Sequence, residues 1–183
     1  MQQPKAPYQY LISFLWSLFE ATFFFIIPDV WLSFASLESL KNGFKNIGFA
    51  LLGALVGGSI MYVLGSYTII NVATFLEFIP DINSNRLLEV EEILKNEGLT
   101  AIFMGPIKGI PYKIYASYSG VLALNFPLFI LISIPARAMR FIITVVITHL
   151  VSKIILKKVS LSNKKIILIL IWILLYTLYF TSL

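Results

Sequence analysis

The sequence has no cysteine and only one histidine among its 183 residues. A chain without cysteine forms no disulfide, has no thiolate nucleophile and binds no metal through a cysteine thiolate. The single histidine, His149, is not part of an HExxH motif, so the sequence does not indicate a zinc enzyme. We find neither an Asp/His cluster nor a convincing Ser–His pair, and we therefore expect no metal site, no cofactor and no enzymatic activity.

Charge is also scarce in this sequence. Only 13% of the residues are charged, whereas 58% are hydrophobic, and the mean hydropathy is +0.88. These values lie far outside the range of soluble globular domains, so we predict an all-α, polytopic integral membrane protein. The net charge of +5 is expected to reflect cytoplasmic loops rather than nucleic-acid binding.

Three apolar runs are predicted to be transmembrane helices, at residues 47–70, 128–151 and 166–183. The first two are long enough to cross a bilayer at about 1.5 Å per residue. The third has no interior charge and is expected to act as an anchor or a packing helix. Residues 1–13 form a polar tail and the start of a first apolar helix, and we expect no signal-peptide cleavage there.

The first of these spans contains small residues at helical spacing. Gly53, Gly57 and Gly65 form one row, and Gly58 continues a neighbouring row of alanines. Small residues spaced in this way let a second helix backbone approach closely, within one subunit or between subunits of an oligomer. The alternative is the ordinary tolerance of membrane helices for glycine.

Residues 83–97 have a different pattern. Leucine, isoleucine and valine alternate with acidic and basic residues at helical spacing, and Asn83 and Gly98 are suitable caps. The segment is predicted to be an amphipathic surface helix.

Two hydrophobic segments are interrupted by charge and by helix-breaking residues. The segment 99–123 includes the run MGPIKGIPYK at 104–113, with two lysines, two prolines and two glycines. The segment 20–36 has Glu20 and Asp29 on either side of an apolar run that ends at Pro28. Broken backbone at membrane depth occurs only when it is buried in protein or lines a wet cavity. We predict two re-entrant hairpins, broken by Pro28, Pro106, Gly109 and Pro111.

The distribution of basic residues predicts the topology. The loop 152–165 contains five lysines, all within 153–165, and is the strongest cytoplasmic signal. Counting back from it, the hairpin 99–123 enters from outside and the hairpin 20–36 enters from the cytoplasm. The chain then contains two copies of a hairpin and a span with opposite orientation, an arrangement typical of transporters. If one hairpin is a full span, the topology before it reverses.

The predicted hairpins and the span 128–151 carry ionisable residues of both signs. Glu20 and Asp29 belong to the first hairpin, Lys108 and Lys113 to the second, and Arg137 and Arg140 to the following span. Such residues in a membrane are functional candidates by default. The cations outnumber the carboxylates, which suits a phosphate. The alternative is that the charges neutralise one another and only fix helix register.

Four motifs in this order are similar to the DedA superfamily, also called the VTT or SNARE-associated Golgi protein domain, and in particular to its bacterial YqaA-like branch. They are FEATFFFIIPDV at 19–30, Gly57-Gly58 with Tyr62 and Gly65, GIPYKI at 109–114 with Ser119-Gly120, and ARAMRF at 136–141. The resemblance covers about residues 14–150 and has no counterpart for the final span.

This resemblance implies two facing re-entrant hairpins, movement of phospholipids or polyprenyl phosphates between leaflets, and coupling to protons. Glu20 and Asp29 fall on the acidic positions of the family, and Lys108 and Lys113 fall near its basic positions. The family pattern has arginines there, with the second one residue further along than Lys113.

The sequence therefore predicts a protein of the bacterial inner membrane that translocates or scrambles an anionic lipid. Lys108, Lys113, Arg137 and Arg140 would bind the headgroup, while Glu20 and Asp29 would exchange protons or compete for those cations. Other possibilities are a proton- or ion-coupled carrier of small solutes, an assembly or scaffold protein and, less favoured, an intramembrane lipid phosphatase or phosphotransferase.

Overall fold

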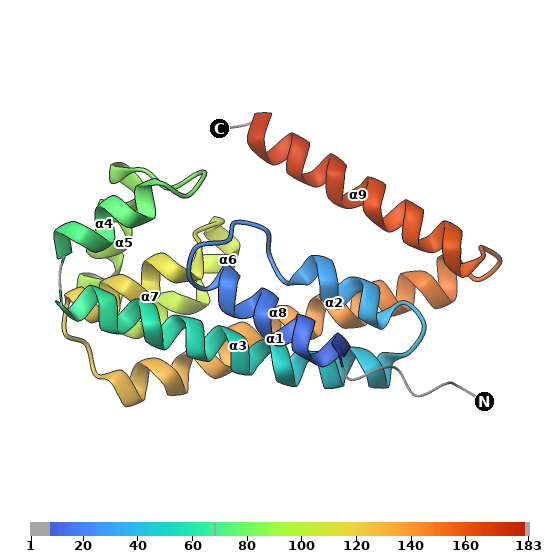
Figure 1. The fold of residues 1–183 in the computed structure, drawn as a ribbon, viewed down its shortest axis with the longest axis horizontal. Coiled ribbons are helices and arrows are strands. Elements are labelled where there is room, and N and C mark those ends of the chain that lie inside the picture. Colours follow the sequence, from blue (N-terminus) through green and yellow to red (C-terminus); the bar gives the residue numbers. More distant parts are fainter. Residues whose placement is uncertain (1–7, 68, 182–183) are drawn as a thin grey trace.

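The computed structural model describes residues 8–67 and 69–181, and this part of the chain is helical with no strand (Figure 1). Three helices are long and apolar enough to cross a membrane, as expected of a membrane protein. They are α3 (Leu40–Tyr67), α8 (Phe126–Leu150) with its continuation to Ile155, and α9 (Leu161–Thr181). The polar tail predicted for residues 1–7 lies outside the described residues.

Helix α3 is the centre of the fold, and its glycines lie where other helices touch it. A Cβ at Gly53 would overlap the carbonyl oxygen of Phe14 in α1 (Tyr8–Glu20). A Cβ at Gly65 would overlap the carbonyl oxygen of Ser117 in α7 (Tyr112–Val121). Gly57 lies against α1 in the same way, and Gly58 lies against the ring of Tyr112. The small residues thus let α1 and α7 lie directly on the backbone of α3.

The first broken segment consists of α1, the loop 21–28 and α2 (Asp29–Ser36). Its first arm is α1, so the predicted range 20–36 begins at the tip of the segment rather than at its start. The helix ends at Glu20, and the N–H groups of residues 22, 23 and 24 all turn back to the single carbonyl of Phe19. Pro28, with φ of −67°, then begins α2, where its missing N–H is not needed.

The second broken segment consists of a 3₁₀ turn at Gly98–Phe103, α6 (Gly105–Lys108) and α7. Gly109 ends α6 in the left-handed conformation, with φ of 69°, which glycine adopts without steric cost. Pro111 is extended and precedes the first residue of α7. The helical elements of this segment occupy Gly98–Val121, which overlaps the predicted range 99–123 closely.

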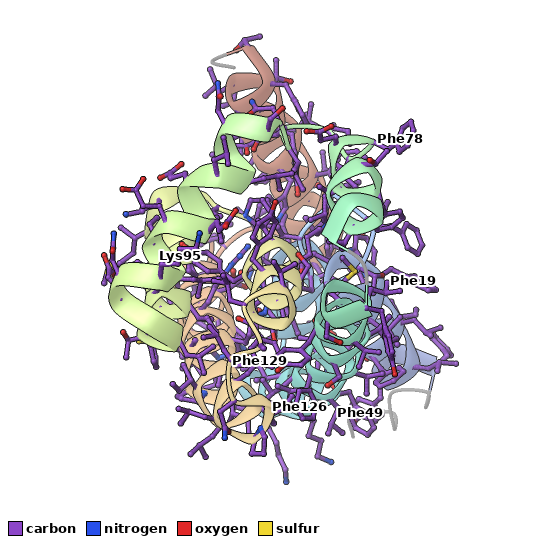
Figure 2. The ribbon with its side chains drawn as sticks, turned by 90° about the vertical axis from the view of Figure 1, so that its left-hand side faces the viewer. Phe19, Phe49, Phe78, Lys95, Phe126 and Phe129 are labelled. Atoms are coloured by element: carbon purple, nitrogen blue, oxygen red, sulfur yellow. The ribbon has the colours of Figure 1, made fainter. Side chains whose placement is uncertain are left out.

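Two helices connect α3 to the second broken segment: α4 (Ile69–Glu77) and α5 (Ser84–Glu97). Helix α5 begins where the side chain of Asn83 accepts a hydrogen bond from the N–H of Arg86, and Gly98 ends it. It buries Leu87, Val90 and Leu94, while Lys95 points away from the molecule (Figure 2). The helix is amphipathic over nearly the residues that the sequence indicated.

We expect Asn83→Ala to lower the free energy of unfolding by about 1 kcal/mol, because the N–H of Arg86 loses its acceptor at the start of α5. Chemical unfolding of the purified protein would measure the change. Asn83→Asp is the control, since aspartate supplies the same acceptor and should retain most of the stability. Equal losses in both variants would show that the cap does not stabilise this helix.

Exposed apolar side chains cover much of the outside of α3, α8 and α9. Phe78, which is 83% exposed, and Phe19 project from one side of the molecule in Figure 2. Helix α8 contains Pro135 and continues as a π-helix at Val151–Ile155, so the predicted loop 152–165 is partly helical. Helix α9 follows a turn at 156–160 and runs obliquely along one side of the other helices (Figure 1).

Candidate functional site

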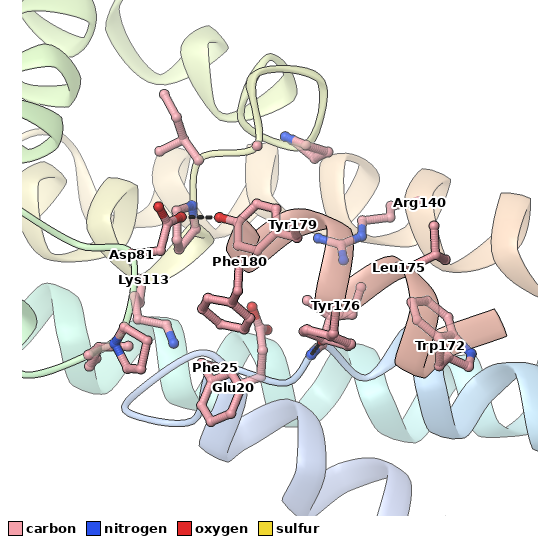
Figure 3. A pocket seen from close by; sticks show the side chains of 17 residues that line it. Glu20, Phe25, Asp81, Lys113, Arg140, Trp172, Leu175, Tyr176, Tyr179 and Phe180 are labelled. Atoms are coloured by element: carbon pink, nitrogen blue, oxygen red, sulfur yellow. Dashed lines mark hydrogen bonds between the residues drawn. The ribbon is translucent and has the colours of Figure 1, made fainter. Parts of the chain in front are cut away.

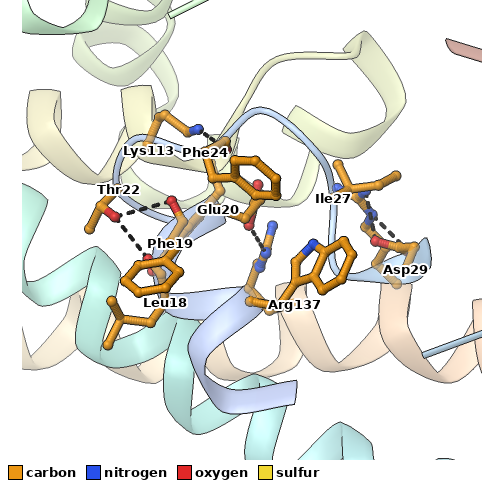
Figure 4. A network of polar contacts seen from close by, with 12 residues as sticks. Leu18, Phe19, Glu20, Thr22, Phe24, Ile27, Asp29, Lys113 and Arg137 are labelled. Carbon is orange, nitrogen blue, oxygen red and sulfur yellow. Dashed lines mark hydrogen bonds and ion pairs between the residues drawn. The ribbon is translucent and has the colours of Figure 1, made fainter. Parts of the chain in front are cut away.

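The tips of the two broken segments meet. The amine of Lys113, at the start of α7, donates a hydrogen bond of 2.7 Å to the carbonyl oxygen of Phe24, in the loop after α1 (Figure 4). Lys113 is only 2% exposed. The contact explains how an irregular loop is tolerated inside the fold, because a buried carbonyl that has left a helix needs another donor.

Glu20 and Arg137 form a buried ion pair at this junction. One guanidinium nitrogen of Arg137 lies 2.5 Å from a carboxylate oxygen of Glu20, and both side chains are buried. The rings of Tyr112 and Phe141 lie 4.9 and 5.0 Å from the Arg137 guanidinium carbon. In these apolar surroundings, loss of either charge would leave the other buried without compensation. The Arg137 Nε is buried and has no hydrogen-bond partner in the described part of the chain, so the pair leaves one donor unused.

Asp29 and Arg140 form a second ion pair. An Arg140 guanidinium nitrogen lies 2.9 Å from an Asp29 carboxylate oxygen, and Thr144 donates a hydrogen bond of 2.6 Å to the same carboxylate. Arg137, Arg140 and Thr144 are three or four residues apart and so lie on one face of α8. This face of α8 therefore meets both carboxylates of the first broken segment.

A cavity of about 410 Å³ lies beside this cluster (Figure 3). Its charged lining includes Glu20, Lys113 and Arg140, whereas Arg137 and Asp29 do not line it. Prolines and Gly109 of the second broken segment form part of the wall. A cavity with a mainly apolar wall and a few convergent polar groups is typical of a binding site.

Another part of the wall of the cavity comes from α9. Its lining residues from this helix are Trp172, Leu175, Tyr176, Tyr179 and Phe180. The sequence analysis assigned no site residue to this span. The spacing of its aromatic residues by three and four was the available signal, since it puts them on one face of an otherwise aliphatic helix.

Lys108 does not belong to the cluster. It is exposed on α6 and does not line the cavity, although the sequence analysis grouped it with the other cations. The left-handed turn at Gly109 separates it from Lys113, so the two lysines do not share a helix face. A charged residue that the sequence did not single out, Asp81, lines the cavity instead. Its carboxylate forms an ion pair with Arg86.

The tyrosines of α7 are mainly buried packing residues. Tyr112, Tyr115 and Tyr118 are each 5% exposed or less, and they do not line the large cavity. Tyr112 stacks on Phe129 and donates a hydrogen bond to Ser133, both on α8. These tyrosines therefore pack between helices rather than facing this cavity.

Comparison with known proteins gives one distant relative. No family model matches the chain, and no solved structure matches it. The chain is 26% identical over 127 residues to an uncharacterised protein of Haemophilus influenzae. The match covers 69% of this chain and 65% of that protein. A likeness at this level to a protein without a described activity assigns neither a family nor a function.

Proposed function

We propose that the protein moves an anionic lipid between the leaflets of a bacterial inner membrane, with the headgroup passing through the cavity. The observation that carries the proposal is Lys113, a buried cation at the junction of two broken helical segments. The resemblance of the sequence motifs to the DedA superfamily points to the same activity. In this proposal the two segments are re-entrant hairpins, and the basic segment 153–165 is cytoplasmic.

The charge balance of the cluster supports a site for an anion. Glu20 is paired with Arg137 and Asp29 with Arg140, so these four charges neutralise one another. Lys113 is not part of an ion pair among the described residues, and its amine donates instead to a neutral carbonyl. This favours function over a purely structural role, because a surplus buried cation is costly unless an anion binds there at some stage.

Lys113 and Arg140 would contact a phosphate, since both line the cavity. Arg140 is about a quarter exposed and is suited to bidentate phosphate contact, whereas Lys113 acts as a point charge. Arg137 is a positioning residue in this scheme, because it holds Glu20 at the edge of the cavity. Glu20 and Asp29 would compete with the phosphate for the cations, and binding a proton would weaken that competition.

The test is leaflet exchange of fluorescent lipids in proteoliposomes, comparing Lys113→Gln with Lys108→Gln. Both variants lose one lysine charge from the same broken segment, but only Lys113 lines the cavity. We expect Lys113→Gln to slow exchange of an anionic lipid phosphate at least tenfold and Lys108→Gln to change it less than twofold. Size-exclusion profiles and thermal unfolding would establish that both variants are folded.

Equal rates for the two variants would remove Lys113 from the mechanism. If folded wild-type protein exchanges no lipid, with and without a pH gradient, the lipid proposal is wrong. A volume of about 410 Å³ also suits a small molecule, so solute uptake that depends on the proton gradient would be measured next.

A further inference from the structure

Helix α9 combines two properties that are unusual together. None of its residues in Leu161–Thr181 is buried, so it is the least embedded of the three long apolar helices. It nevertheless supplies five of the residues that line the cavity. A wall that buries so little surface against the rest of the molecule is held by few contacts, and it separates from its neighbours at low cost.

The contacts that α9 makes at the cavity are few and specific. Tyr176 accepts a hydrogen bond of 2.9 Å from the N–H of Ile27, and Trp172 donates one of 3.0 Å to Ser33. Tyr179 donates a hydrogen bond to the carboxylate of Asp81 (Figure 3). We call these three hydrogen bonds the closing contacts. They join α9 to the first broken segment and to the turn between α4 and α5.

Aromatic contacts also hold the C-terminal part of α9 against the first broken segment. Phe25, in the loop of the first broken segment, lies 6.4 Å from the Tyr176 ring and 5.9 Å from the Phe180 ring, edge to face in both cases. Both partners of Phe25 line the cavity, as does Phe25 itself. The position of α9 is thus connected directly to the loop whose carbonyl binds Lys113.

The opposite end of α9 is attached differently. The chain leaves α8 through the π-helix at Val151–Ile155 and a turn at 156–160. The amine of Lys164 donates hydrogen bonds of 2.7 and 3.1 Å to the carbonyl and hydroxyl oxygens of Ser152. Because π-helical segments interrupt the regular hydrogen-bond ladder of a helix, they often occur where a helix bends. This end is therefore suited to be a hinge.

We propose that α9 is the lateral gate of the cavity: it rotates about the segment 151–160, the closing contacts hold it shut, and their release opens the cavity to the lipid. The inference rests on the proposed function for what passes through the gate. It gives α9 a role of its own, and it makes Trp172, Tyr176 and Tyr179 positioning residues that control access to Lys113 and Arg140.

Cross-linking tests the gate, and the absence of native cysteine makes every introduced thiol unique. Ser33→Cys with Trp172→Cys places thiols across the closing contacts, and Ser152→Cys with Lys164→Cys places them across the hinge. Each pair would be joined by a short bis-methanethiosulfonate reagent that reductant removes. We expect the first cross-link to slow lipid exchange at least tenfold, reversibly, and the hinge cross-link to change it less than twofold. Undiminished exchange with α9 cross-linked at Ser33 would overturn the proposal.

A second measurement does not depend on lipid movement. Spin labels on Leu178 of α9 and Leu64 of α3, both exposed, would report how far the free end of α9 lies from the body. Labels on Ile166 and Ile147 would report the hinge end. We expect two distances at the free end, with the longer one enriched at least threefold by Tyr176→Phe with Tyr179→Phe, and one distance at the hinge. A single, unchanged distance at the free end would show that α9 does not open, whether or not the protein moves lipids.

Discussion

Arg137→Met is expected to lower the free energy of unfolding by about 3–5 kcal/mol, because it leaves the carboxylate of Glu20 buried without its cation. Methionine resembles the arginine stem in size and retains the packing between Tyr112 and Phe141. The loss is therefore assigned to the charge rather than to a cavity. Unfolding of the purified protein in mixed detergent, followed by circular dichroism, would measure it.

The double variant Glu20→Gln with Arg137→Met is the control for the single variant. It removes both charges, so we expect most of the stability to return while lipid exchange remains impaired. That result would separate the structural role of the pair from its role in transport. If Arg137→Met is as stable as the wild type, the buried pair does not hold the two segments together. If the double variant moves lipid at the wild-type rate, Glu20 is not needed for movement.

Gly65→Val is expected to be strongly destabilising, with a loss in the free energy of unfolding of about 3 kcal/mol or more. A Cβ at this position would meet the backbone of Ser117, and a backbone cannot rotate aside as a side chain does. Helices α3 and α7 would have to separate, which would also move Lys113 from the cavity. Folded yield and the unfolding midpoint in detergent would show the change.

Gly48→Val is the matched control on the same helix. No atom lies within 4 Å of a Cβ built at Gly48, so the added side chain meets open space. Valine also has a better helix propensity than glycine, and we expect a stability equal to or slightly above that of the wild type. Similar losses at both positions would show that close packing against α7 is not the reason for glycine at position 65.

The membrane character and the helical class follow from composition alone. A chain with so few charges and so many apolar residues has no arrangement in water that covers its surface, and long apolar runs in such a chain form helices. The breaks were also visible, because proline and glycine interrupt regular helices through local sterics. Gly109 ends α6, whereas Pro28 and Pro111 stand immediately before α2 and α7. The start of the first broken segment was not visible in the sequence. The apolar run 8–19 contains no proline or glycine that would mark it as the first helix of that segment.

The cluster was foreseen in part. The spacing of Arg137 and Arg140 put both on one helix face, and the carboxylates of the first broken segment were evident acceptors. The partner of each was not evident, because Glu20 and Arg137 are 117 residues apart and meet only through the packing of α1 and α8 around α3. Lys108 and Lys113 looked equivalent in sequence, and the left-handed turn between them separated the exposed lysine from the buried one.

The all-helical class, the membrane character and the placement of charge next to helix breaks were evident before the structure, since those properties depend on composition and on local backbone sterics. The tertiary structure was needed to show which charges are paired, that Lys113 has no carboxylate partner among the described residues, and that α9 lines the cavity. The physical reason is that pairing and enclosure depend on the distances between segments far apart in the chain, and local pattern does not specify those distances.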